Sequence, residues 1–124
     1  FELFEKHIKL AQRIMDDIID LELEKIEKIQ AKIDSDPESE EVKHTERMLW
    51  EKIYKKSGQG RRTGVGITAE GDMLAALGLR YGTEEATDFS EKVHKTIALN
   101  AYRSSVEMAR ERGAFDIYDT EREF

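Results

Sequence analysis

An arginine- and glycine-rich segment is the part of this sequence whose residue types and spacing could bind an anion. Arg61 and Arg62 come shortly before Gly64 and Gly66, and Asp72 follows six residues later. Guanidinium groups bind carboxylates and phosphates in fixed geometry, and glycine-rich backbone can offer N–H groups to a phosphate. The segment lacks the end of a Walker loop, and no apolar strand precedes it as in a dinucleotide site. We therefore favour a tight junction in which the glycines permit close backbone packing.

Two Glu-x-x-His pairs could bind a metal, namely Glu41 with His44 and Glu91 with His94. Di-iron four-helix bundles use such pairs together with a glutamate from each of two further helices. Helical periodicity turns both pairs away from the apolar faces of their helices, so we favour solvated faces and expect no metal site in this chain. A carboxylate di-metal bundle remains the third alternative for its function.

A cluster of carboxylates lies on the predicted first helix, at Asp16, Asp17 and Asp20. Like-charged neighbours of this kind usually form a solvated face, and we expect that here. The 124 residues include no cysteine, which excludes a disulfide framework, a zinc–thiolate site, an iron–sulfur cluster and a thiol nucleophile within the chain.

The charge balance and hydropathy limit the partners of the chain. With 27 acidic and 20 basic residues the net charge is −7, which argues against non-specific binding to nucleic acid. No apolar run is long enough to cross a bilayer and no secretory signal opens the sequence, so we expect no membrane partner and a cytoplasmic location. Because the first residue is Phe1, we expect that the chain was processed or cut from something longer.

The spacing of apolar residues predicts a mainly α-helical single domain. Capping residues, glycines and one proline divide it. We expect a long helix over 1–34, a second helix over 37–56 that makes a hairpin with it, a Gly/Arg loop or short strand over 57–68, a short helix over 69–79, a final long helix over 83–112 and a tail over 113–124. Asp36 is the expected N-cap of the second helix, with Pro37 in its first position, and Thr68 is that of the short helix. Thr83 and Gly113 are the expected ends of the final helix.

The predicted helices differ in how many apolar faces they carry. The main stripe of the first helix comprises Phe4, Ile8, Ala11, Met15, Ile19, Ile26, Ile29 and Ile33. Its second stripe comprises Leu3, Leu10, Ile14 and Leu21, and lies about 100° around the axis. We expect the second helix to bury Val42, Leu49, Trp50 and Ile53, and the final helix to bury Ala86, Phe89, Val93, Ile97, Asn100, Ser104 and Met108. A short hairpin cannot cover both stripes of the first helix, so we expect the isolated chain to form a homo-oligomer through the second stripe.

The run from Gly60 to Gly82 resembles the large catalytic subunit of ribonucleotide reductases, which has an Arg-Arg-x-Gly-x-Gly stretch followed by Leu-Ala-x-x-Gly-x-x-Tyr. The blocks Ala11–Leu21, Ala98–Ser105 and Glu111–Phe115 fit the same family. The acidic helical pair after the first block is more similar to the adenosylcobalamin-dependent branch than to the diiron-dependent one. Ala69 stands where the family usually has a third glycine, and Glu70 where it usually has an apolar residue.

The resemblance implies that this chain is an internal fragment of a larger α/β barrel. In the parent, Thr63 to Ile67 would be a barrel strand and the rest of the barrel would be the partner that covers the second stripe. The parent would reduce ribonucleotides to deoxyribonucleotides by a radical mechanism, with adenosylcobalamin as its cofactor.

The family's reaction depends on cysteines, which this chain lacks, so we predict that the chain alone is inactive and contributes no catalytic, cofactor-binding or metal-binding residue. Arg61, Arg62, Gly64, Gly66 and Asp72 would support the barrel, with an anion contact as their other role. The alternative function is a stand-alone acidic helical module for interaction or oligomerisation.

Overall fold

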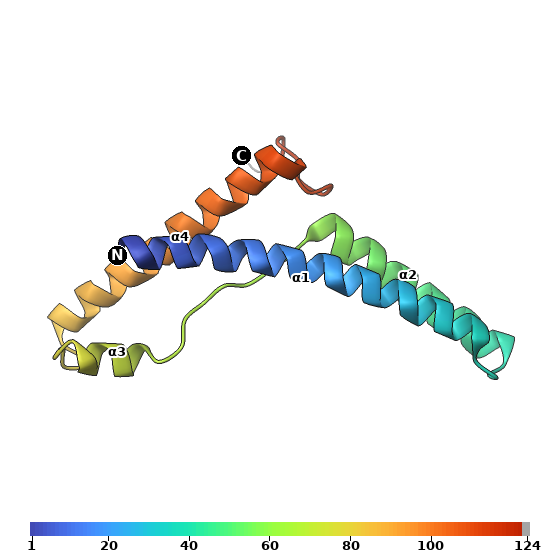
Figure 1. Ribbon diagram of the computed structural model, residues 1–124, viewed down its shortest axis with the longest axis horizontal. Helices are drawn as coiled ribbons and strands as arrows, with labels where there is room; N and C mark the ends of the chain where they lie inside the picture. Colours follow the sequence, from blue (N-terminus) through green and yellow to red (C-terminus); the bar gives the residue numbers. More distant parts are fainter. Residues whose placement is uncertain (123–124) are drawn as a thin grey trace.

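Four helices make up the computed structural model, which describes residues 1–122. They are α1 (Glu2–Ser35), α2 (Glu40–Gly60), α3 (Glu70–Ala76) and α4 (Glu84–Arg112). Helix α2 folds back along the C-terminal half of α1, and α4 crosses the N-terminal half (Figure 1). The described residues contain no strand, so the mainly helical prediction is confirmed and residues 63–67 are extended without being paired. None of these helices is long and apolar enough to span a bilayer.

The turn between α1 and α2 is longer than predicted. Asp36 follows the last residue of α1 with an extended ψ of 145°, the conformation favoured before a proline. The N-cap of α2 is Ser39 instead of Asp36, because the Ser39 hydroxyl accepts a hydrogen bond from the Val42 N–H at 3.4 Å. The second helix therefore begins at Glu40 and not at Pro37.

The face of α2 that packs on α1 differs in part from the prediction. Trp50 and Ile53 are half-buried as expected, but Val42 and Leu49 are exposed, so the prediction for these two residues was wrong. The helix is turned so that Arg47 reaches back to α1, where its Nε donates to Asp34 Oδ1 at 2.8 Å. This ion pair takes the place on the α1 side that the apolar pattern assigned to Leu49.

Two glycines expected to end α2 lie inside it. A Cβ atom on Gly58 would lie 3.6 Å from Leu23 Cδ1, and one on Gly60 would lie 3.5 Å from Ile117 Cδ1. The small residues therefore let the last turn of α2 approach α1 and the C-terminal tail closely. For this reason the helix continues to Gly60 and not to Lys56 as predicted.

Helix α4 packs against α1 through the stripe predicted for it. Ile8 of α1 forms a core with Val93 and Ile97 of α4, and Ser104 is fully buried. The Ser104 hydroxyl donates to the backbone oxygen of Lys9 at 2.9 Å, which satisfies the polar group at the contact. Thr83 and Gly113 bound α4 as predicted.

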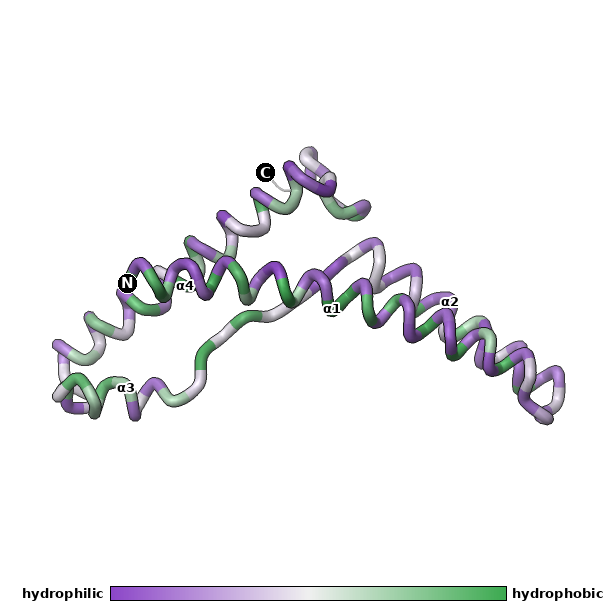
Figure 2. Tube along the Cα trace, in the orientation of Figure 1, coloured by the Kyte–Doolittle hydropathy of each residue, from purple (hydrophilic) through white to green (hydrophobic). Residues whose placement is uncertain are grey.

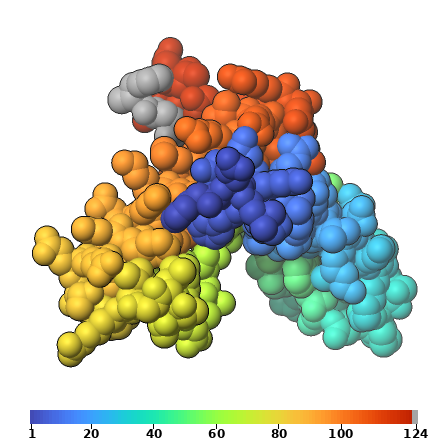
Figure 3. All heavy atoms as spheres, turned by 60° about the vertical axis from the view of Figure 1, so that its left-hand side comes forward, coloured from blue at the N-terminus to red at the C-terminus, as the bar shows by residue number. Residues whose placement is uncertain are grey.

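The second stripe of α1 is not covered by the rest of the chain. Hydrophobic residues recur along the whole of α1 in Figure 2, and those of its main stripe are buried or half-buried. The four residues of the second stripe are between 50% and 67% exposed. Figure 3 shows the N-terminal end of α1 between two separated lobes, with α3 and the start of α4 on one side and the hairpin of α1 and α2 on the other. The expectation that one side of α1 lacks cover is confirmed.

Helix α3 is shorter than predicted. Its N-cap is Ala69 instead of Thr68, with φ 61° and ψ 33° in the left-handed region, and the helix ends at Ala76. Gly78, with φ 73°, lies in the turn that follows. Beyond α4, the described tail consists of turns and irregular backbone, and the end of the predicted tail, residues 123–124, lies outside the described residues.

Candidate functional site

Arg61 lies at the point where the chain leaves α2. It is the C-cap of the helix, with φ 41° and ψ 44°, and its N–H donates to the Ser57 carbonyl at 2.9 Å. From here residues 62–68, which we call the extended segment, lead to α3 (Figure 1). A left-handed residue at this position redirects the backbone sharply, as C-terminal caps commonly do.

The Arg61 side chain binds two carboxylates of α1. Its Nε donates to Asp16 Oδ1 at 2.7 Å, and its Nη1 donates to Asp20 Oδ1 at 2.8 Å. A third hydrogen bond joins Nη2 to the backbone oxygen of Asp16 at 2.9 Å. The hydrogen bonds to Asp16 and Asp20 raise the pKa of Arg61 above its usual value. The guanidinium is therefore occupied by the protein itself, in the bidentate manner predicted for an external anion.

Asp16 also binds the end of α4. Arg112 Nη1 donates to Asp16 Oδ2 at 2.6 Å and to Asp17 Oδ1 at 2.9 Å. Burial alone would raise the pKa of Asp16, but the hydrogen bonds from Arg61 and Arg112 lower it below its usual value. These residues form an arginine–aspartate cluster, comprising Arg61, Arg112, Asp16, Asp17 and Asp20. The expectation of a solvated acidic face was therefore wrong for Asp16, whose side chain is only 14% exposed.

The other residues of the motif lie apart from this cluster. Arg62 is exposed, and Asp72 is exposed in the first turn of α3. A Cβ atom added to Gly64 or Gly66 would meet no atom within 4 Å. The tight backbone packing that we favoured for these two glycines is therefore absent from the described residues.

The extended segment has unused backbone hydrogen-bonding groups. Within residues 1–122, none of its N–H groups donates to another backbone group. Its exposure alternates, with Thr63, Val65 and Ile67 half-buried and the residues between them exposed. Gln12 Nε2 donates to Thr63 Oγ1 at 3.2 Å and ties the start of the segment to α1. This alternation is the pattern of a β-strand that has one covered face.

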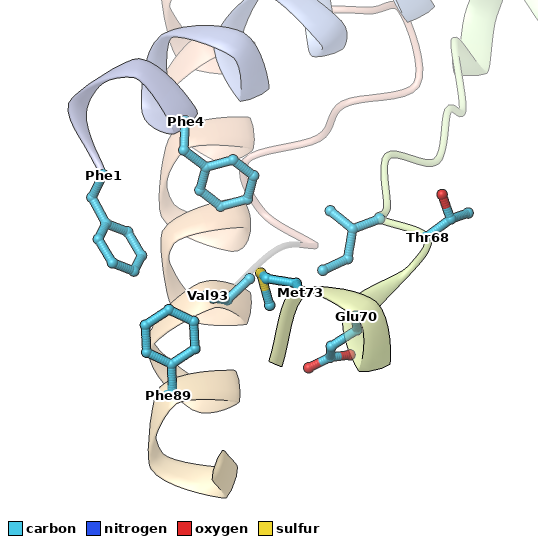
Figure 4. A pocket seen from close by; sticks show the side chains of 8 residues that line it. Phe1, Phe4, Thr68, Glu70, Met73, Phe89 and Val93 are labelled. Atoms are coloured by element: carbon cyan, nitrogen blue, oxygen red, sulfur yellow. The ribbon is translucent and has the colours of Figure 1, made fainter. Parts of the chain in front are cut away.

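An apolar cavity of about 390 Å³ lies where α1, α3 and α4 meet. Figure 4 shows Phe1 and Phe4 on one side, Phe89 and Val93 on α4, and Met73 on α3. No pattern in the sequence drew attention to this cavity, although Phe4, Phe89 and Val93 belong to stripes identified from their spacing.

Glu70, at the edge of the cavity, is bonded to two residues of α4. Ser90 Oγ donates to Glu70 Oε1, and His94 Nε2 lies 3.2 Å from Glu70 Oε2. The bond from Ser90, followed by that from His94, lowers the pKa of Glu70. Both partners bond to the carboxylate and no bond joins them to each other, so no base is placed to activate the serine. The group fastens α3 to α4.

The two Glu-x-x-His pairs are not brought together. Glu41 and His44 lie near the start of α2, whereas Glu91 and His94 lie on the first turns of α4, at the opposite end of the molecule (Figure 1). Over residues 1–122, no three His, Cys, Asp or Glu side chains are grouped so that they could hold a metal ion. The described geometry therefore gives the di-metal alternative no support.

Comparison with known sequences identifies the family. The barrel domain of ribonucleotide reductase matches residues 1–123. The chain belongs to this family. A vitamin B12-dependent ribonucleoside-diphosphate reductase of Mycobacterium tuberculosis is 36% identical over 62 residues, which cover 50% of this chain and 9% of that protein. The corresponding enzyme of Thermoplasma acidophilum is 35% identical over 65 residues, covering 52% of this chain and 8% of that protein.

A third relative matches more of the chain. The ribonucleoside-diphosphate reductase subunit alpha of Chlamydia pneumoniae is 27% identical over 117 residues, which cover 94% of this chain and 9% of that protein. This member of the ribonucleotide reductase family thus spans less than a tenth of the length of the curated relatives it matches. No solved structure matches the sequence.

Proposed function

We propose that this chain is a non-catalytic segment of a ribonucleotide reductase catalytic subunit and supports the barrel in which the reaction takes place. The parent protein reduces ribonucleotides to deoxyribonucleotides by a radical mechanism in the cytoplasm, with adenosylcobalamin as its cofactor. The names of the M. tuberculosis and T. acidophilum relatives support the dependence on vitamin B12. Because the chain has no cysteine, it does not carry out the reaction alone.

The observation that carries this proposal is the extended segment. A stretch of backbone with open N–H groups is seldom left unpaired in a folded protein, because each unpaired group costs free energy once it is removed from water. A neighbouring barrel strand would supply the missing bonds. Gly64 and Gly66 fit this role, since nothing inside the described chain requires the absence of their side chains. A close neighbour in the parent barrel would require it.

The arginine–aspartate cluster serves this role by fixing where the segment begins. Arg61 bonds to both the side chain and the backbone of Asp16, so the exit of the chain from α2 is held against α1. Arg62 and Asp72 remain exposed, and we assign them contacts with the parent barrel. In this proposal Arg61, Arg62, Gly64, Gly66 and Asp72 shape the barrel and take no part in the chemical step.

A substitution in the extended segment tests the proposal in the complete reductase. Val65→Pro removes one backbone N–H donor, and Val65→Thr keeps both this donor and the branched shape. In the complete enzyme we expect Val65→Pro to abolish most ribonucleotide reduction and to lower the melting temperature, while Val65→Thr retains activity. In the 124-residue chain, where this N–H has no backbone partner, Val65→Pro should leave the melting temperature nearly unchanged. A complete reductase that stays fully active with Val65→Pro contradicts the proposal.

A stand-alone helical interaction module is the second candidate function, and the exposed second stripe of α1 favours it. The gene distinguishes the two candidates. A reading frame that continues on both sides, with a cysteine upstream, supports the reductase segment. A complete reading frame that begins shortly before Phe1 supports the module.

A further inference from the structure

The second stripe forms a continuous apolar line on the side of α1 that α2 and α4 leave open. Its four residues, Leu3, Leu10, Ile14 and Leu21, are 67%, 52%, 50% and 61% exposed. At about 100° and 1.5 Å per residue, they lie within about 40° of one another around the helix and span about 27 Å along it. Ile18, at 44% exposure, borders the same line. An exposed apolar line of this length normally has a partner.

The spacing of the stripe is two-fold symmetric. Its steps are seven, four and seven residues, so it reads the same in both directions about position 12. In an antiparallel pair of α1 helices centred there, Leu3 of one copy faces Leu21 of the other, and Leu10 faces Ile14. A two-fold interface requires one surface that is complementary to itself, and this stripe meets that requirement. Packing against an unrelated body gives no reason for symmetric spacing.

The charged residues beside the stripe agree with the same alignment. With position 12 at the centre, Lys6 and His7 of one copy come level with Asp17 and Ile18 of the other. The Asp17 side chain is 57% exposed even though it accepts a hydrogen bond from Arg112, so it can also meet a cation of the second copy. Because the chain carries a net charge of −7, two copies repel one another overall, and such local pairing of opposite charges favours this alignment over others.

We infer that the second stripe is the docking surface for a second copy of this chain, with the two α1 helices antiparallel and centred at position 12. The inference goes beyond the barrel-supporting role, which concerns the extended segment on a different part of the molecule. The dimer is measured by its mass and the role by activity of the complete enzyme, so the failure of one is distinguishable from failure of the other.

Sedimentation equilibrium of the 124-residue chain over a concentration series tests the surface. We expect the mass of two chains, falling to one on dilution. Ile14→Glu places a charge at the centre of the seam and should weaken the dimer more than about tenfold. The matched control is Leu99→Glu, which changes an exposed leucine on α4 and should leave the dimer intact. Circular dichroism should show unchanged helix content in both variants. A wild-type chain that stays monomeric, or a dimer that Ile14→Glu does not weaken, overturns the inference.

Disulfide formation tests the alignment without background, because the chain has no cysteine of its own. Leu3→Cys and Leu21→Cys should form a disulfide with each other when the two variants are mixed. Either variant alone should not, since like positions at the ends of an antiparallel seam lie about 27 Å apart. Cross-linking of either variant with itself, as expected for parallel helices, overturns the antiparallel alignment.

Discussion

Arg61 donates to Asp16 twice, from Nε to the carboxylate at 2.7 Å and from Nη2 to the backbone oxygen at 2.9 Å. The two residues lie 45 positions apart in the sequence. The planar guanidinium binds one residue at two places, so it fixes both the rotation and the distance of the end of α2 relative to α1. A point charge could satisfy the carboxylate but could not hold this geometry.

We therefore expect Arg61→Lys to destabilise the chain although the charge is kept. The ammonium of lysine cannot span the carboxylate and the backbone oxygen together, and the expected loss is about 1–2 kcal/mol in the free energy of unfolding. Urea denaturation at neutral pH measures it. Arg62→Lys is the matched control, because Arg62 is exposed, and it should change stability by less than about 0.5 kcal/mol. Equal effects of the two substitutions would contradict the role given to Arg61.

Asp16 should make the chain sensitive to acid. Its pKa in the folded chain lies below the unfolded value because the hydrogen bonds from Arg61 and Arg112 outweigh burial. The stabilisation is therefore complete above the unfolded pKa, near about 4, and is lost as the pH falls through the lower folded pKa. Asp16→Asn should be less stable than the wild type at pH 7, and the difference should shrink at pH 3. Urea denaturation at both pH values measures this, and a difference that does not depend on pH argues against the cluster as its source.

Ala69→Gly should stabilise the chain. Ala69 has φ 61°, a conformation that costs an L-residue with a Cβ about 1 kcal/mol and glycine almost nothing. The residue that the related reductases usually carry here therefore suits this backbone better than alanine does. We expect a gain of about 0.5–1 kcal/mol, measured by thermal denaturation. Ala75→Gly, inside α3, should instead destabilise the chain, because the helix interior disfavours glycine.

Gly66 and Gly78 should respond differently to alanine. Gly66 has no left-handed φ and its missing Cβ would meet no atom, so Gly66→Ala should leave the stability of the 124-residue chain within about 0.5 kcal/mol. Gly78 has φ 73°, so Gly78→Ala should cost about 1 kcal/mol. Thermal denaturation of both variants makes the comparison. A large loss for Gly66→Ala would mean that the extended segment packs within the chain itself.

Apolar periodicity predicted the helices and the face that α4 buries, including the polar residues Asn100 and Ser104. These two residues stand at regular helical spacing among apolar neighbours, and burial follows from that spacing. The face of α2 could not be obtained in the same way. Arg47 pairs with Asp34 across the hairpin, and a count of apolar positions contains no information on such long-range ion pairs.

The sequence indicated Arg61 but not the residues that bind it. Asp16 lies in α1 and Arg112 at the end of α4, and only the crossing of the two helices brings them to Arg61. The bonds of Glu70 to Ser90 and His94 were also not predicted, because they depend on how α3 docks against α4. Local spacing predicts which side chains share a helix face, whereas contacts between elements depend on tertiary packing.

Helix α1 holds α4 with its N-terminal half and α2 with its C-terminal half, around separate groups of buried residues near Ile8 and near Ile26. The protein therefore consists of two small cooperative units joined by one rod. Damage to either unit can leave the other folded. Amide hydrogen exchange should accordingly separate the backbone into two classes of protection, one for each half of the rod.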